Sequence, residues 1–166
     1  KKNADGSYTI GAAVAGAEAH EREDITADWP GIIEAWDLIG STQIQGRASL
    51  GGNLCNASPA GDSVPAMVAA GMTANIAGPD GRRTLPVEEV TAGPGKTNLK
   101  KGEFIVSFNL PAKPSNGGDA YLRLIPRTEM DIAVVGCGVA LTLDDSGTVT
   151  SAKVSLGAVA ATVLVV

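Results

Sequence analysis

A glycine-rich segment between residues 49 and 62 carries the residue types that could hold a phosphate. Its core reads Ser49-Leu50-Gly51-Gly52-Asn53. Consecutive glycines reach φ values that other residues avoid, and without Cβ atoms their successive N–H groups can point at one anion. Side chains add further donors without adding charge: Ser49, Asn53, Asn56 and Ser58. The segment predicts a diphosphate cradle built from dipoles, although two glycines considered alone also fit a plain tight turn.

Two other glycine segments resemble phosphate loops less well. Gly95-Lys96-Thr97 matches the end of a P-loop, but Val90 stands where that motif needs its first glycine. Gly136-Cys137-Gly138 matches the start of a dinucleotide fingerprint, but Leu141 occupies the third glycine position. We therefore interpret the second segment as a strand that packs closely on a neighbour.

The cradle needs elements to position it, and hydrophobic periodicity predicts a helix on each side. The first would have Asp28 as its N-cap, Pro30 in its first turn and Gly40 as its stop, and its apolar residues recur at helical spacing: Ile32, Ile33, Trp36 and Ile39. The second would be capped by Asp62 and end at Gly71. The intervening residues 41–59 are rich in Gly, Asn and Ser, which predicts an ordered loop.

The rest of the chain predicts mainly strands. Residues 73–77 and 83–85 form a predicted hairpin, and an alternating strand runs over 104–110. Residues 112–118 have the composition of a linker, which predicts a boundary between units 1–111 and 119–166. Beyond it, 134–143 and 149–156 predict a second hairpin. The expected class is α+β, with an antiparallel sheet flanked by helices.

Composition excludes several classes of function. The formal charge of −5 lacks the basic surface expected of a nucleic-acid or anionic-membrane binder. Two cysteines, Cys55 and Cys137, provide neither a disulfide framework nor the four thiolates that an iron–sulfur cluster normally takes. We find no catalytic acid–base set and no metal-ligand cluster, and His20 is expected to be a partly exposed helix residue.

The ends of the sequence predict an excised fragment in a cytoplasmic protein. The chain opens just before a predicted strand and stops inside the apolar run Val163-Leu164-Val165-Val166. No stretch reaches the roughly 18 apolar residues of a membrane span, and residues 1–6 lack an apolar signal core. We therefore expect no membrane association and a cytoplasmic location.

The glycine segment and its surroundings resemble the FAD-binding medium subunits and domains of the molybdenum hydroxylase family, which includes carbon monoxide dehydrogenases and xanthine dehydrogenases. The resemblance extends over nearly the full chain, in the same order and spacing. Its signatures are Ile39-Gly40-Ser41-Thr42-Gln43-Ile44-Gln45-Gly46-Arg47, the residues from Ala48 to Asp62, Gly93-Pro94-Gly95-Lys96-Thr97, residues 102–111, Tyr121-Leu122-Arg123-Leu124-Ile125-Pro126-Arg127-Thr128-Glu129-Met130-Asp131-Ile132-Ala133 and Leu156-Gly157-Ala158-Val159-Ala160.

The resemblance implies a fold and a role in a larger enzyme. Residues 1–111 would be the second subdomain of a p-cresol methylhydroxylase-type FAD-binding domain without its first subdomain, and 119–166 the first strands of a C-terminal α+β domain. The family's FAD passes electrons from iron–sulfur clusters to NAD or another acceptor. The clusters and the molybdenum cofactor would belong to partners, an iron–sulfur small subunit and a molybdopterin large subunit of a heterotrimer or a dimer of heterotrimers.

The resemblance also implies which residues contact FAD. Ser49, Leu50, Gly51, Gly52 and Asn53 fall on the pyrophosphate loop, and Asn56 and Asp62 are further contacts. Ile39 and Ile105 are expected to be apolar contacts of the flavin, and Arg123 a basic residue close to it. The structural alternatives are an N-cap for Asp62, helix core for Ile39 and a surface charge for Arg123. Arg127, Glu129 and Asp131 would order the C-terminal domain or form a structural ion-pair network.

Two other functions stay open from the sequence. One is a different flavin reductase on the same fold, and the other is a non-catalytic assembly module that docks partner subunits without FAD. Residues 56–62 and the linker near Gly117 argue against the first. The hydroxylated substrate and the electron acceptor are not specified by any motif in the chain.

Overall fold

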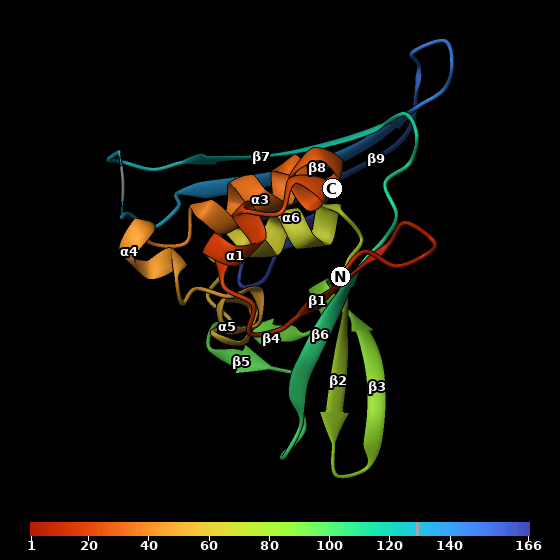
Figure 1. Cartoon of the computed structure of the whole chain (residues 1–166). Coiled ribbons are helices and arrows are strands. Elements are labelled where there is room, and N and C mark those ends of the chain that lie inside the picture. Colours follow the sequence, from red (N-terminus) through yellow and green to blue (C-terminus); the bar gives the residue numbers. More distant parts are fainter. Residues whose placement is uncertain (129) are drawn as a thin grey trace.

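A computed structural model describes residues 1–128 and 130–166, and it consists of two antiparallel four-stranded sheets with helices between them (Figure 1). The first sheet has the order β1-β6-β2-β3. Its strands are β1 (Tyr8–Gly11), β2 (Thr73–Gly78), β3 (Gly81–Pro86) and β6 (Phe104–Leu110). The predicted α+β class with antiparallel sheets is confirmed.

The second sheet has the order β10-β9-β8-β7 and lies across the helical layer from the first (Figure 1). Its strands are β7 (Gly117–Leu124), β8 (Val135–Leu143), β9 (Val149–Gly157) and β10 (Leu164–Val165). One face packs against helices α3 and α6. The other face exposes large apolar side chains from three strands: Leu122, Leu124, Leu141, Leu143 and Leu164.

The helices are short. They are α1 (Gly16–His20), α2 (Glu23–Asp28), α3 (Pro30–Asp37), α4 (Thr42–Gln45), α5 (Leu50–Cys55) and α6 (Ser63–Ala69), and a 3₁₀ turn (Val87–Glu89) precedes the small β4–β5 ribbon (Thr91–Gly93 and Lys96–Thr97). Residues of α3, α5 and α6 form one core with the first sheet, in which Trp36, Leu50, Met67 and Phe108 are fully buried.

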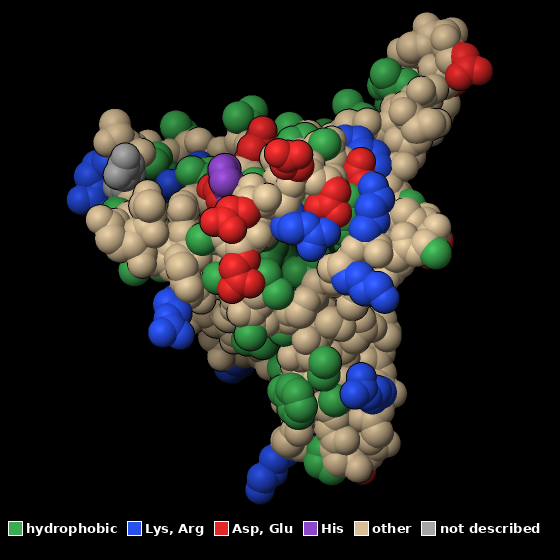
Figure 2. Space-filling view, in the orientation of Figure 1, with side chains coloured by type: hydrophobic (Ala, Val, Ile, Leu, Met, Phe, Trp, Pro, Cys, Tyr) green, Lys and Arg blue, Asp and Glu red, His purple; other side chains and the backbone are tan. Residues whose placement is uncertain are grey.

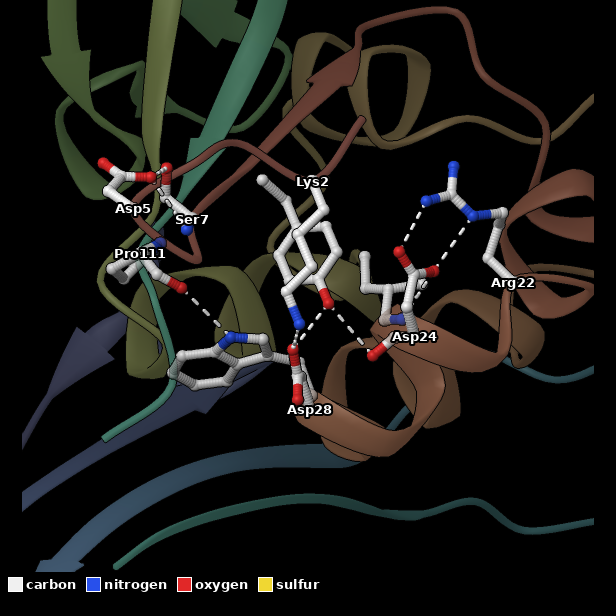
Figure 3. Close-up of polar contacts among 10 residues, drawn as sticks. Lys2, Asp5, Ser7, Arg22, Asp24, Asp28 and Pro111 are labelled. Carbon is white, nitrogen blue, oxygen red and sulfur yellow. Dashed lines mark hydrogen bonds and ion pairs between the residues drawn. The ribbon is translucent and has the colours of Figure 1, made fainter. Parts of the chain in front are cut away.

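Helix α3 has the predicted apolar face, but its start is different from the prediction. Asp28 does not cap it: Asp28 ends α2, and its carboxylate binds the Lys2 ammonium at 2.6 Å (Figure 3). The carboxylate at the start of α3 is that of Asp119 in β7. Burial raises the pKa of Asp119, and the Lys113 charge and the N–H groups of Gly31 and Ile32 oppose that rise. The prediction missed this because the partner lies about 90 residues away in the chain.

Acidic side chains gather over the helices on the face shown in Figure 2, and several are paired with cations. Arg22 binds Asp24 at 2.6 Å, as Lys2 binds Asp28 (Figure 3). His20 is 63% exposed and its Nδ1 lies 2.6 Å from Asp37.

The predicted loop over residues 41–59 is wrong, because it contains α4 and α5. Ser49 caps α5 by accepting the Gly52 N–H, and Leu50 and Leu54 anchor the helix in the core. These interactions offset the low helix propensity of two glycines. Strand β7 starts at Gly117, inside the segment predicted as a linker.

None of the helices in the described part of the chain is long and apolar enough to cross a membrane.

Candidate cofactor-binding site

The predicted cradle is the N-terminal end of α5, and its position is fixed by the residue before it. The carbonyl of Ala48 accepts the Gly16 N–H at 2.8 Å and the indole N–H of Trp36 at 3.2 Å. Trp36 is fully buried in α3 and therefore ties the start of α5 to the helical core. Sequence periodicity predicted Trp36 as core, but it did not reveal this hydrogen bond.

Gly51 and Gly52 have different structural roles. Gly51 is buried, its N–H donates to the Ala12 carbonyl at 3.1 Å, and a Cβ on Gly51 would lie 2.5 Å from that oxygen. Gly52 is exposed, and its N–H donates to Ser49 Oγ at 3.1 Å. Both N–H groups are thus bonded within the protein, and they do not point together at one anion as the sequence suggested. The Ser49 hydroxyl keeps its own hydrogen to donate.

An open pocket of about 350 Å³ lies beside these residues. It is lined by Ser49, Gly51 and Gly52 from the start of α5 and by Ile105 from β6. The structure therefore brings together four residues predicted to contact FAD, although more than 50 positions separate the serine from the isoleucine. Sequence reasoning missed the small side chains Ala12 and Ala13, which follow β1 and also line the pocket.

The one carboxylate of the pocket lining, that of Glu103, is paired with a cation. Glu103 accepts two hydrogen bonds from Arg83, at 2.8 and 2.7 Å, and the Lys100 N–H at 2.6 Å. The Arg83 guanidinium and the backbone hydrogen bond lower the pKa of Glu103 to about 2. An anionic ligand in the pocket would meet an ion pair and not an isolated negative charge.

The remaining residues of the glycine segment lie in three different environments. Leu50 is 0% exposed and belongs to the core. Asn53 Oδ1 accepts the Ser63 hydroxyl at 2.7 Å, which joins α5 to the start of α6. Asn56 follows the last turn of α5 and is exposed, so its amide is available to a ligand at the surface.

A second group of predicted residues meets in a buried ion pair. Asp62 Oδ2 lies 2.9 Å from Arg123 Nη1, and the two side chains are only 12% and 7% exposed. Asp62 Oδ1 accepts the Tyr121 hydroxyl at 3.0 Å. Burial raises the pKa of Asp62, while the Arg123 charge and both hydrogen bonds oppose that rise. Burial also raises the pKa of Tyr121.

The structure also shows which contacts these side chains make within the protein. Asp62 is the N-cap residue of α6 by position, as the sequence predicts, but its side chain makes no capping hydrogen bond there. Arg123 is not a surface charge, because it is buried and also donates to the Leu38 carbonyl at 3.3 Å. Ile39, the next residue, follows the end of α3 and packs partly buried against the core.

The two groups are neighbours through α5 and α6, since Asn53 holds Ser63 and Asp62 directly precedes that serine. Tyr121 is a further residue that sequence reasoning missed. The signal was the alternation along β7, which places Tyr121 on the same face of the strand as Arg123.

Two further predictions concern charged groups outside these clusters. Arg127 Nε lies 3.0 Å from Asp131 in an exposed ion pair, whereas Glu129 lies outside the described residues. Over residues 1–128 and 130–166, no group of three or more His, Cys, Asp or Glu side chains is arranged to hold a metal ion.

Comparison with known sequences gives two adjacent matches. The sequence profile of the FAD binding domain in molybdopterin dehydrogenase matches residues 1–113. The profile of the CO dehydrogenase flavoprotein C-terminal domain matches residues 120–166.

Individual relatives agree with these profiles. The xanthine dehydrogenase FAD-binding subunit of Escherichia coli O157:H7 is 31% identical over 159 residues, which are 95% of this chain and 54% of the relative. The carbon monoxide dehydrogenase medium chain of Hydrogenophaga pseudoflava is 31% identical over 140 residues, or 84% of this chain and 48% of the relative. The chain thus spans about half the length of the curated relatives it matches.

A solved structure shows the same fold. A chain of carbon monoxide dehydrogenase from Hydrogenophaga pseudoflava superposes with a TM-score of 0.91 at 29% sequence identity. The match covers 98% of this chain and 56% of that one. Two profile matches, sequence identity and fold lead to one conclusion: the chain belongs to the FAD-binding domain family of the molybdopterin dehydrogenases.

Proposed function

We propose that this chain binds FAD in the pocket at the start of α5 and serves as the electron-transferring flavoprotein part of a molybdenum-containing dehydrogenase. FAD supplies the redox chemistry when it is bound, so the task of the protein is to hold, orient and electrostatically tune the cofactor. Binding and tuning FAD does not require a catalytic acid or base from this chain.

The observation that carries the proposal is the convergence of separate elements on one pocket. The end of β1, the start of α5 and strand β6 each contribute lining residues. Gly52 adds no side chain at the rim, and Ala13 is small, so backbone and ligand can approach closely. The lining offers the Ser49 hydroxyl as a hydrogen-bond donor beside the apolar contact of Ile105.

Five of the predicted residues would then have a defined role. The Ser49 hydroxyl and the Asn56 amide would donate hydrogen bonds to the pyrophosphate or ribityl oxygens. Ile105 would provide an apolar surface. Arg123 would place a positive charge beside the flavin, where negative charge grows on reduction, and Asp62 would accept hydrogen bonds from cofactor hydroxyls.

The partners follow from the same proposal. We expect an iron–sulfur small subunit as electron donor and a molybdopterin large subunit that holds the substrate, in a heterotrimer or a dimer of heterotrimers. NAD or another small acceptor would take the electrons. The relatives that support this are named as subunits of xanthine and carbon monoxide dehydrogenases. A cytoplasmic location stays a prediction of the sequence.

The test is the visible spectrum of the purified complete gene product. We expect a flavin spectrum that is lost or strongly reduced in Gly52→Val, whose side chain would enter the pocket. Gly118→Val is the matched control, because a Cβ on Gly118 has no neighbour within 4 Å and the residue lies on β7, outside the pocket. A well-folded wild-type protein without flavin and without FAD uptake would refute the proposal.

The second candidate is an assembly module without FAD. The observation in its favour is the apolar outer face of the second sheet, where Leu122 is 76% and Leu124 59% exposed. This candidate predicts that Gly52→Val co-purifies with its partners as well as the wild type does, with no flavin in either sample.

A further inference from the structure

The hydroxyl group of Tyr121 is a buried donor to the ion pair of Asp62 with Arg123, two residues proposed to meet FAD. Tyr121 lies in β7, is 3% exposed, and its hydroxyl lies 3.0 Å from Asp62 Oδ1. Its own backbone N–H donates to Glu34 Oε2 at 2.9 Å, which holds the strand against α3 at this residue. The ring and the backbone are therefore fixed independently of the hydroxyl.

The hydroxyl determines how Asp62 can use its second oxygen. Asp62 accepts from Tyr121 on one carboxylate oxygen and from Arg123 on the other, at 3.0 and 2.9 Å. Two donors on separate oxygens fix the rotation of the carboxylate plane, which one donor alone would leave free. Because Arg123 also donates to the Leu38 carbonyl, the guanidinium is held from two sides.

The opposing strand is shaped around this hydroxyl. Gly136 of β8 pairs with Arg123, and a Cβ on Gly136 would lie only 2.4 Å from the Tyr121 oxygen. The glycine thus provides the space in which the hydroxyl reaches Asp62. Three buried side chains, Tyr121, Asp62 and Arg123, thus contact one another beside a glycine that leaves room for the hydroxyl.

We propose that Tyr121 is a positioning residue of the flavin site: its hydroxyl holds the Asp62 carboxylate in the orientation that keeps Arg123 directed at the cofactor. This inference rests on the proposed function, since Asp62 and Arg123 are residues proposed to meet FAD. Tyr121 itself acts through Asp62 and does not contact the cofactor.

The alternative is that the hydroxyl contributes only to folding stability. Tyr8 provides a matched control for that role. It is 1% exposed, and its hydroxyl donates to Asp28 Oδ2 at 2.5 Å, while Asp28 also binds the Lys2 ammonium. The same tyrosine, aspartate and cation chemistry thus occurs in a second place, away from the proposed cofactor residues.

The experiment compares Tyr121→Phe with Tyr8→Phe in the complete gene product, with FAD dissociation constant and flavin midpoint potential as readouts. Tyr121→Phe is expected to raise the dissociation constant by about threefold to tenfold, the size of one ordinary net hydrogen bond, because the lost bond acts on FAD only through Asp62. The midpoint potential should become more negative, because the positive charge is less well held beside the flavin. Tyr8→Phe should change neither quantity.

A double-mutant cycle tests the route of the effect. In an Asp62→Ala background, Tyr121→Phe should cause no further change in FAD affinity, because the carboxylate through which it acts is absent. If Tyr121→Phe does not fold, Asp62→Asn tests the same pair from the acceptor side, since one amide oxygen cannot serve Tyr121 and Arg123 on separate atoms. A loss of affinity of at least the same size is then expected.

The possible failures are distinguishable. A wild-type protein without FAD overturns both the proposed function and this inference. A flavin-containing wild type in which Tyr121→Phe matches Tyr8→Phe, or in which Asp62→Asn changes nothing, overturns the inference alone. An effect of Tyr121→Phe that persists in the Asp62→Ala background overturns the route through Asp62.

Discussion

Alanine substitution should separate the structural role of Gly51 from the binding role of Gly52, although the two residues are adjacent. Both lie in the first turn of α5, where alanine is intrinsically better than glycine by about 1 kcal/mol. A Cβ on Gly51 would lie 2.5 Å from the Ala12 carbonyl oxygen, whereas a Cβ on Gly52 would have Ser49 Oγ as its nearest neighbour at 3.2 Å. Only the first substitution forces backbone to move.

The magnitude for Gly51→Ala follows from three contributions. Overpacking against a rigid neighbour costs about 1–3 kcal/mol. Movement of α5 away from Ala12 also weakens the 3.1 Å hydrogen bond from the Gly51 N–H, at a cost of about 0.5–1.5 kcal/mol. Helix propensity offsets about 1 kcal/mol of these costs. We expect a net loss of about 2 kcal/mol for Gly51→Ala and a gain of up to about 1 kcal/mol for Gly52→Ala.

The assay is urea unfolding of the flavin-free protein, because bound FAD would itself stabilise the folded state and mask the difference. With a denaturant slope of about 2 kcal/mol per molar, the two midpoints should differ by roughly 1.5 M. FAD titration should show a different pattern from unfolding. Gly52→Ala should weaken FAD binding although its fold is as stable as that of the wild type or more so. Equal midpoints for the two variants would show that the close approach of Gly51 to Ala12 does not constrain the fold.

Three further predictions concern other contacts. Ser49→Ala removes the side-chain cap of α5 and should lower the free energy of unfolding by about 1 kcal/mol in the same urea assay. Gly31→Ala places a Cβ 2.6 Å from Asp119 Oδ2 and should lower the free energy of unfolding by about 1–3 kcal/mol. Its control, Gly118→Ala, should change that free energy by no more than about 0.5 kcal/mol. Thermal unfolding that does not distinguish the two variants would contradict this prediction. Glu103 has a folded-state pKa of about 2, below its ordinary value of 4.5. Its contribution to the free energy of unfolding is therefore present above pH 4.5 and is lost as the pH falls towards 2. In Glu103→Gln, the urea midpoint should depend less steeply on pH within this window.

The sequence predicted most strands and the helical core because these depend on local periodicity. The alternation in residues 104–110 matches β6, and the spacing of Ile32, Ile33 and Trp36 matches the buried face of α3. The predicted start of α3 was wrong because the acidic residue at that end of the helix is Asp119, in strand β7 of the second sheet. Local sequence contains no signal for a contact across that distance.

The glycine segment shows the same limit at the site. Residue types indicated a phosphate-binding region, but they favoured a loop, because the packing of Leu50 and Leu54 that makes α5 a helix is a tertiary effect. The meeting of Asp62 with Arg123 was not predictable from spacing either. Only the folded arrangement of α6 against the second sheet brings the two side chains within 2.9 Å.

The distant anchors of α3 also have a consequence for the order of events during synthesis. The indole N–H of Trp29 donates to the Pro111 carbonyl at 3.1 Å, and Glu34 accepts the N–H of Tyr121. Both partners leave the ribosome roughly 85 residues after the helix they hold, which is several seconds or more at ordinary translation speeds. Until then the apolar face of α3 lacks part of its cover, so nascent chains halted before Pro111 should be the ones that chaperones retain.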